Sequence, residues 1–258
     1  MAKRLLRIAG AYLAAALCTV AAPGHAVCQS GSTKALAFEK RDYVEIEGTK
    51  NFNLSAAFTV EMWVTWSIRE HDRQYLFGDE AWPGMSEKIP VKQESGCALR
   101  TTPLSRRLRA VELVLGSTNG WLVVTGKEVP ELGGWHHIAV SKSPQMLRLF
   151  RDGKLDAEKT CTGVTFNSSP TNLFLGVRQY GWKDRSFQGG IRMFRISSSA
   201  RYEKSFKPQR TFAQDADTVV LFDFSDVKGD RIPDVSGNNH EGLIVGARWL
   251  DLRKIGNR

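Results

Sequence analysis

Apolar and polar residues alternate along most of this chain, and the period is two rather than the 3.6 residues of an amphipathic helix. The segment Phe58–Trp66 shows the pattern most clearly, because every even-numbered position is apolar and Trp63 is the only apolar residue at an odd-numbered one. An antiparallel sheet with one buried face requires this alternation. The segment is therefore expected to be a strand that buries its even-numbered side chains.

Other segments carry the same alternation or a short apolar run, and turn-forming residues separate most of them. Asp152-Gly153 is the clearest turn, because a two-residue type I′ loop needs positive φ at both positions and these residue types accept it. The other expected strands are Lys34–Phe38, Tyr43–Ile46, Tyr75–Gly78, Ala98–Arg100, Ala110–Leu115, Trp121–Thr125, Trp135–Lys142, Met146–Arg151, a strand from Lys154, Asn172–Val177, Gly190–Ile196, Val219–Phe224 and Leu243–Trp249.

Many short strands joined by turns, with no long amphipathic helix, predict an all-β fold: a two-sheet antiparallel jelly-roll sandwich. The first and last strand regions are expected to lie close together, as the ends of a domain often do. No internal repeat or low-complexity linker divides the chain, so residues 27–258 are expected to form a single domain. The longest irregular stretch is Asp79–Gly96, and loops of this length are usually functional or mobile.

The first 26 residues have the composition of a secretory signal peptide, with a basic start, an apolar run and small residues at the end. They hold three of the 36 lysines and arginines and none of the 27 acids, which leaves the remainder with a net charge of +6. No later stretch is apolar for the ~18 residues that a membrane span needs. The sequence therefore predicts a secreted or periplasmic protein with no membrane span.

Three cysteines follow the signal peptide: Cys28, Cys97 and Cys161. Outside the cytosol two of them are expected to pair. Cys97 and Cys161 are the preferred disulfide pair because both flank expected strands, and Cys28 would then be free or pair elsewhere. No cysteine or histidine spacing indicates a zinc site. His136 and His137 alternate across a strand, so they point to opposite faces and cannot ligate one ion together.

Four stretches in order along the chain resemble the laminin G-like domains of exported bacterial proteins. That family has a concanavalin A-like jelly-roll fold and most often serves recognition, so the resemblance implies a lectin-like binding role. The stretches are Ala35–Val64, the strand and hairpin Trp135–Leu155, Gly190–Pro208, and Asp215–His240.

One departure from the family pattern concerns Arg192 and Met193, which stand where many relatives have an Asp-Asp pair. Any role of those acids is therefore open in this chain. Relatives that bind calcium use acidic side chains and backbone carbonyls, as a hard cation requires. Calcium is thus an open possibility with unknown ligands, and no other cofactor or metal site is expected.

Aromatic side chains beside charged ones provide the candidate ligand-binding residues, because an aromatic plane can stack on the apolar face of a sugar ring. Four lie in one loop between two expected strands, where binding residues are common. Trp63 projects from the otherwise polar face of its strand, which in a jelly roll can line the concave groove; packing under a covering loop is the alternative. The full set is Arg178, Tyr180, Trp182, Asp184, Trp63, Trp82 and Trp121.

Catalytic residues are not assigned. A retaining glycosidase needs two carboxylates about 5–5.5 Å apart, and glucanases of this fold supply them from one strand as acids spaced by two. No Glu-x-Asp-x-x-Glu stretch, Gly-x-Ser-x-Gly elbow or phosphate loop occurs here. The first hypothesis is a non-catalytic carbohydrate-binding module, with a glycan as partner. A scaffold that contacts a surface protein comes second and a polysaccharide-degrading enzyme third; nucleic acid is not expected as a partner.

Overall fold

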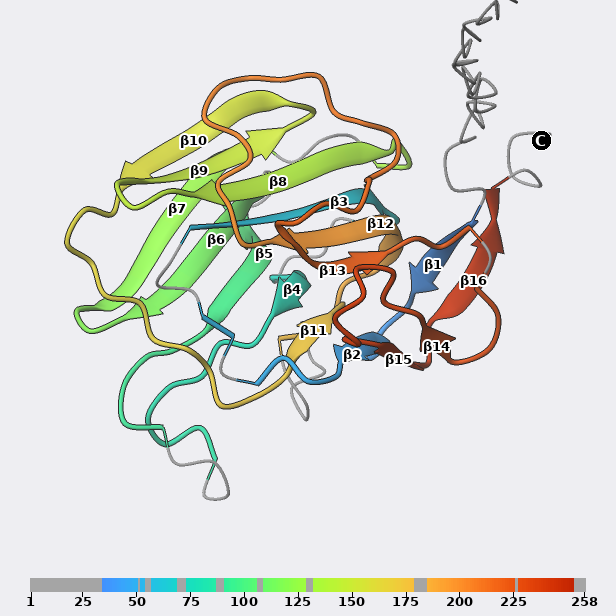
Figure 1. The fold of residues 1–258 in the computed structure, drawn as a ribbon, viewed down its shortest axis with the longest axis horizontal. Helices are drawn as coiled ribbons and strands as arrows, with labels where there is room; N and C mark the ends of the chain where they lie inside the picture. Colours follow the sequence, from blue (N-terminus) through green and yellow to red (C-terminus); the bar gives the residue numbers. More distant parts are fainter. Residues whose placement is uncertain are drawn as a thin grey trace, which may run out of the picture.

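The computed structural model describes residues 34–50, 52–53, 57–68, 73–86, 91–105, 109–128, 132–178, 185–225 and 227–252. These residues form two antiparallel sheets that stack as a sandwich, shown in Figure 1. Sheet A contains β1 (Lys34–Phe38), β3 (Phe58–Trp66), β8 (His136–Lys142), β9 (Met146–Arg151), β10 (Lys154–Thr160), β12 (Gly189–Ser197), β13 (Thr218–Phe222) and β16 (Arg248–Asp251). Sheet B contains β2 (Tyr43–Ile46), β4 (Tyr75–Gly78), β5 (Cys97–Pro103), β6 (Arg109–Ser117), β7 (Gly120–Glu128), β11 (Leu173–Leu175), β14 (Arg231–Ile232) and β15 (Gly242–Val245).

The strand order confirms the expected jelly-roll sandwich. Sheet A runs β10-β9-β8-β3-β12-β1-β16, and sheet B runs β14-β15-β2-β11-β4-β5-β6-β7. β3 pairs along the whole of β12, so β1 and β13 share the opposite edge of β12, one on each half. β1 also pairs with β16, which confirms that the first and last strand regions lie side by side. No helix in the described ranges is long and apolar enough to cross a membrane.

The core lies between the two sheets and follows the alternation of the sequence. The even-numbered side chains of β3 are buried there together with Ile138 and Val140 of β8. Leu99 of β5 and Leu113 of β6 approach from sheet B. At the Asp152-Gly153 turn both residues have positive φ, 50° and 73°, as the expected two-residue hairpin requires.

The opposite face of β3 is covered rather than open. A segment that we call the strap, residues 198–217, crosses the outer face of sheet A, and the Trp63 indole donates to the Gln209 carbonyl at 2.9 Å. Thr59 and Glu61 are therefore fully buried although their face is polar. Trp63 lies under this covering loop, which was the alternative to a place in an open groove.

At the C-terminal end one expected strand differs from the structure, and one observed strand was not expected. The expected strand Leu243–Trp249 is interrupted by Gly246, whose φ of +86° turns the chain, so that β15 joins sheet B and β16 joins sheet A. β14 has only two residues, too few for a periodic pattern to reveal it. Most other expected strands differ from the observed ones only at their ends.

The disulfide expected between Cys97 and Cys161 is not formed, because both cysteines are free and buried. Cys97 begins β5 in sheet B, whereas Cys161 follows β10 in sheet A and its thiol lies beside the Ser143 carbonyl at 3.6 Å. Flanking a strand gave no information on which sheet that strand joins. Burial raises the pKa of both thiols, so neither is a ready thiolate. Cys28 and the proposed signal peptide lie outside the described residues.

Candidate functional site

The outer face of sheet B carries a cluster of aromatic and charged side chains. Arg100 and Glu112 lie on adjacent strands and face each other in the register, and Tyr75 of β4 faces Arg100 from the other side. Their sequence neighbours Leu99 and Leu113 point into the core, so these three side chains point outward. With Glu80, Trp82 and Arg178 from the adjoining loops they form what we call the sheet B cluster.

Arg100 holds this cluster together through charge-assisted hydrogen bonds. Its Nε donates to Glu112 Oε1 at 2.8 Å, and its Nη1 donates to the Tyr75 hydroxyl at 2.8 Å and to Glu80 Oε1 at 3.2 Å. The Tyr75 hydroxyl donates in turn to Glu80 Oε1 at 3.1 Å. Such bonds to a planar guanidinium fix the direction of each partner. The polar groups are therefore held in place before any ligand arrives.

Arg178 adds an aromatic stack to the same cluster. Its guanidinium lies 4.3 Å from the ring centroid of Trp82 and 5.5 Å from that of Tyr75, within the range of a cation–π contact. It also forms an ion pair with Glu80 at 3.4 Å. One acid thus links both arginines, and Trp82 is held half-buried at the margin of the cluster.

Burial shifts the proton affinities of several groups here. Burial, followed by the charge of Glu80, raises the pKa of Tyr75 above its ordinary value. Burial lowers the pKa of Arg100, but Glu80, Tyr75 and Glu112 outweigh it and keep the guanidinium charged. Burial also raises the pKa of Asp79, the residue before Glu80, to about 7. The cluster therefore holds a buried neutral phenol between charged side chains at neutral pH, and Arg100 and Trp82 are its more exposed members.

The long stretch Asp79–Gly96 supplies part of the cluster and returns across the sheet. Ala81 and Ser95 exchange backbone hydrogen bonds of 2.9 Å, which close the stretch at its base. A side chain on Gly116 of β6 would lie 2.3 Å from the Ser95 nitrogen, so this glycine permits the close approach. Glu80 and Trp82 are consequently positioned on the sheet face by the loop that the sequence singled out.

The predicted site residues fall into three groups. Arg178 and Trp82 come together in the sheet B cluster, and Trp121 of β7 projects from the same face opposite Gly116, without a described contact to either of them. Trp63 lies under the strap on the other sheet. Tyr180, Trp182 and Asp184 lie outside the described residues.

Sequence reasoning missed Tyr75, Glu80, Arg100 and Glu112. Two of them carried a signal, because Arg100 and Glu112 are charged residues within or beside expected strands whose neighbours are apolar. Their meeting depends on β5 pairing with β6 in one particular register, which the chain does not display locally.

A second polar cluster lies on the outer face of sheet A, but it is sealed under the strap. Glu61 accepts hydrogen bonds from Arg195 at 2.6 Å, Tyr202 at 2.8 Å and His137 at 3.1 Å. Burial raises the pKa of Glu61, yet His137 and Arg195 outweigh it and hold that pKa below its ordinary value. Glu61 and His137 have no exposed surface, so the cluster serves to fix the strap.

The described part of the chain contains no group of three or more His, Cys, Asp or Glu side chains that could hold a metal ion. Two carboxylates do share the face of sheet B, namely those of Glu80 and Glu112. Both are ion-paired with Arg100, which lies between them.

These observations place the protein in the class of antiparallel jelly-roll sandwiches. Its distinguishing feature is an aromatic and charged cluster on one sheet face. The family profile described as the concanavalin A-like lectin/glucanases superfamily matches residues 38–205. The chain belongs to that superfamily, as the laminin G-like resemblance had indicated.

Solved structures share the fold at low sequence identity. One is a crystal structure of a candidate carbohydrate-binding protein from Bacteroides ovatus, with a TM-score of 0.64 and 19% identity over 86% of this chain. This chain spans 60% of that protein's length. Another is the CBM40 domain of the Ruminococcus gnavus IT-sialidase, with a TM-score of 0.50 and 15% identity over 66% of this chain and 94% of that one. No curated protein sequence is similar enough to count as a match.

Proposed function

We propose that this protein is an exported, non-catalytic carbohydrate-binding module whose ligand contacts the sheet B cluster. The observation that carries the proposal is the stack of Arg178 on Trp82 beside the hydrogen-bonded set of Arg100, Glu80 and Tyr75. A sugar offers an apolar ring face and a rim of hydroxyl groups. An aromatic plane and fixed planar donors and acceptors match those two features.

The relatives of known structure support the same role. The Bacteroides ovatus protein, which shares the fold over most of this chain, is described as a candidate carbohydrate-binding protein. The charge balance of the cluster also supports this role, because each acid in it is already ion-paired with an arginine. A ligand hydroxyl can then join a network whose charges are balanced, which costs less than desolvating a lone carboxylate.

A glycoside hydrolase is the second candidate, because Glu80 and Glu112 lie on one sheet face. A general acid must carry a proton that it can give to the leaving group. Both acids instead accept hydrogen bonds from Arg100, at 3.2 Å and 2.8 Å, so their carboxylate oxygens are held by a guanidinium rather than aimed at a leaving group. Binding without cleavage is therefore the better-supported function.

The test is a glycan array with the full chain and two single variants. Trp82→Ala and Arg178→Ala are expected to lower binding of the captured glycan at least tenfold, since each removes half of the stack. Trp249→Ala is the matched control, because Trp249 is equally half-buried but belongs to β16 at the far edge of sheet A.

Three results would count against the proposal. Binding to no glycan would favour a protein partner. Equal losses in the variants and the control would place the ligand elsewhere. Shortened oligosaccharides after prolonged incubation, absent with Glu112→Gln, would favour the hydrolase.

A further inference from the structure

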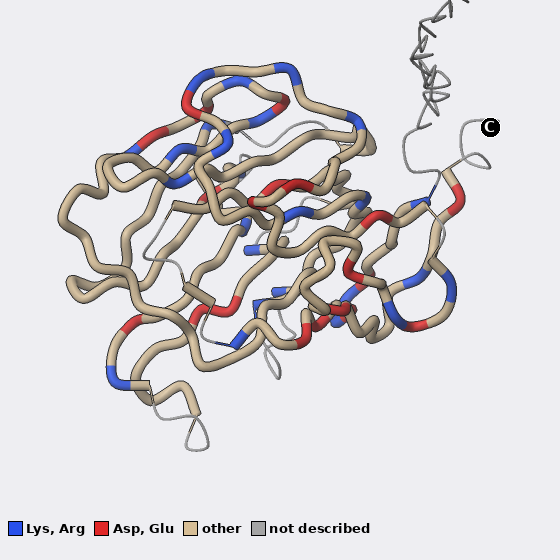
Figure 2. Tube along the Cα trace, viewed as in Figure 1, with Lys and Arg blue, Asp and Glu red and all other residues tan. Residues whose placement is uncertain are grey.

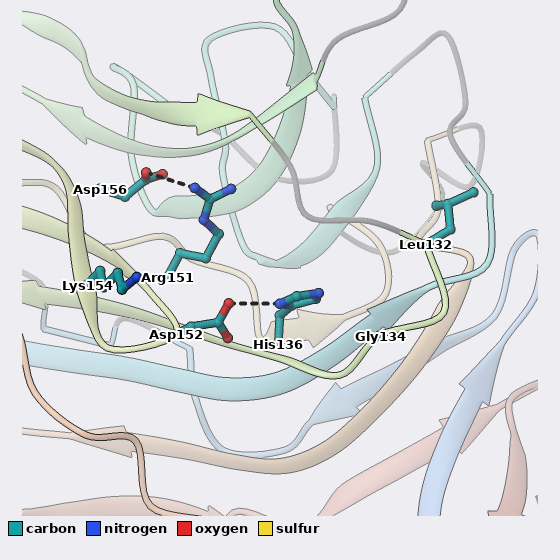
Figure 3. Close-up of a pocket in the computed structure, with 7 residues that line it drawn as sticks. All are labelled: Leu132, Gly134, His136, Arg151, Asp152, Lys154 and Asp156. Carbon is teal, nitrogen blue, oxygen red and sulfur yellow. Dashed lines mark hydrogen bonds and ion pairs between the residues drawn. The ribbon is translucent and has the colours of Figure 1, made fainter. Parts of the chain in front are cut away.

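A separate pocket of about 510 Å³ opens at the end of the sandwich, where β7 of sheet B approaches β9 and β10 of sheet A. Figure 3 shows the side chains of His136, Arg151, Asp152 and Lys154 around it. It shares no residue with the sheet B cluster, so a ligand here would not compete for that surface. These four residues lie on β8 and on the β9–β10 hairpin, all within sheet A.

His136 is oriented by the carboxylate of Asp152. Its Nδ1 lies 2.8 Å from Asp152 Oδ2, while Asp152 Oδ1 accepts the backbone N–H of His137 at 2.9 Å. In the tautomer that donates from Nδ1 to Asp152, Nε2 is left as a hydrogen-bond acceptor. Nε2 has no hydrogen-bond partner among the described residues, and a side chain on Gly134 would begin only 3.0 Å from it. The glycine therefore leaves the approach to Nε2 open.

Arg151 is positioned from the other side of the pocket by Asp156. The two side chains form an ion pair at 3.6 Å, and Asp156 Oδ2 accepts the backbone N–H of Lys127 at 2.9 Å. Asp156 occupies the β-bulge of β10, which turns it inward, and Gly126 leaves room for it because a Cβ there would lie 2.2 Å from Oδ2. Both acids of the pocket are thus engaged in holding a cationic or imidazole side chain in place.

The surroundings of the pocket are basic. The strap lies against the hairpin turn, since the Phe206 N–H donates to the Gly153 carbonyl at 2.7 Å. Residues 146–160 and the strap, residues 198–217, together hold eight lysines and arginines against six acids. Figure 2 shows basic and acidic positions interspersed along the hairpin and the strap. The small excess of positive charge favours anions at this end of the molecule.

We propose that this pocket binds a sugar acid, a saccharide unit that carries both a carboxylate and free hydroxyl groups. Arg151 and Lys154 bind the carboxylate, and Nε2 of His136 accepts the hydrogen of a hydroxyl group. A fixed guanidinium suits a carboxylate because two of its N–H groups can engage both oxygens. The assignment depends on this pocket alone, and it stands or falls independently of the sheet B cluster.

The test is to titrate the full chain with each of three probes: glucuronate, glucose and inorganic phosphate. Calorimetry measures the affinity, and the NMR signals of the histidine rings report contact with His136. Glucuronate is expected to bind at least tenfold more tightly than glucose and to shift the His136 ring signals. Arg151→Gln and Lys154→Gln are each expected to weaken glucuronate binding at least fivefold. His136→Ala is expected to weaken glucuronate binding but not phosphate binding, because phosphate needs only the two cations. Lys40→Gln, a change at an exposed lysine just after β1, is the control and leaves glucuronate binding unchanged, whereas Trp82→Ala tests the sheet B cluster as the alternative site.

Three outcomes would overturn this assignment. One is equal binding of glucuronate and glucose. The second is glucuronate binding that survives both Arg151→Gln and Lys154→Gln, where Lys154 is exposed and its variant is expected to fold. The third is phosphate binding as tight as that of glucuronate with no effect of His136→Ala, which would leave a simple anion site. If only Trp82→Ala abolished glucuronate binding, the binding site of the sugar acid would be the sheet B cluster and not this pocket.

Discussion

Asp79 is a residue whose ionisation is strongly altered by the fold. Its carboxyl group is fully buried, Oδ1 accepts the Cys97 N–H at 2.7 Å, and Oδ2 has no hydrogen-bond partner in the described part of the chain. Burial raises its pKa from an ordinary 3.8 to about 7. The folded protein therefore binds this proton more tightly than the unfolded chain does, and the proton stabilises the fold.

The stability of the protein is expected to fall as this proton is lost. The stabilising effect is complete below pH 3.8, declines as the pH rises, and is gone above about pH 7. Asp79→Asn keeps an acceptor for Cys97 but cannot ionise. Between pH 5 and pH 8 the wild type is therefore expected to lose roughly 2–3 kcal/mol relative to this variant.

Urea denaturation of both proteins at the two pH values measures this difference. Asp217→Asn, a change at an exposed acid, is the control and is expected to track the wild type. A constant difference between wild type and Asp79→Asn across the range would show that Asp79 stays ionised in the fold.

At the scale of an element, the strap is held by buried charge in addition to the apolar contacts of Phe212 with Met193 and Leu221. Glu61 pairs with Arg195, and the Tyr202 hydroxyl connects the strap to the same carboxylate. The Arg195 side chain is only 5% exposed, so removing the negative charge would leave a buried cation unpaired. The loss of one partner of a buried pair typically costs 3–5 kcal/mol, far more than the loss of a surface pair.

Glu61→Gln is therefore expected to destabilise the protein by about 3 kcal/mol, and Tyr202→Phe by about 1 kcal/mol. Tyr202→Phe is also expected to speed hydrogen exchange in residues 198–217 while sheet B remains protected, because it loosens only the strap. Glu241→Gln, which removes an exposed pair with Arg231, is the comparison and should change neither measurement. Equal acceleration of exchange in both sheets after Tyr202→Phe would contradict a local role.

The elements themselves could largely be predicted from the chain, because each strand of this sandwich buries one face. Phe58–Trp66 was predicted to its exact ends for that reason. The pattern could not reveal that Glu61 is buried, since the covering strap lies more than 130 positions away in the chain. The sequence also indicated Arg178 and Trp82 as candidate site residues but not Arg100 and Glu112. Those two come together only because β5 and β6 pair in one particular register.

At the scale of the whole molecule, sheet A is completed by strands from both ends of the described chain. β16 covers the edge of β1, and the Trp249 ring packs on Phe224 with centroids 5.5 Å apart. A chain ending after Ala247 would expose the edge of β1 and lose that contact. Unpaired strand edges promote association between molecules.

Truncation after Ala247 is therefore expected to cost about 3 kcal/mol, the scale of losing a packed tryptophan, and to produce dimers or larger species. Urea denaturation and analytical ultracentrifugation measure the two effects. A chain ending after Leu252 retains β16 and is the matched control. A truncated protein that stays monomeric and equally stable would show that β16 contributes little.

The pairing of Lys34 with Asp251 also means that the chain can be rewired. Because β16 runs into β1 as neighbouring antiparallel strands, a short loop could join them as a hairpin, and the protein could be opened instead at the exposed turn of Thr118 and Asn119. Such a circular permutant would keep β16 paired with β1 and would carry its new ends, available for fusion to other domains, at the turn between β6 and β7 of sheet B.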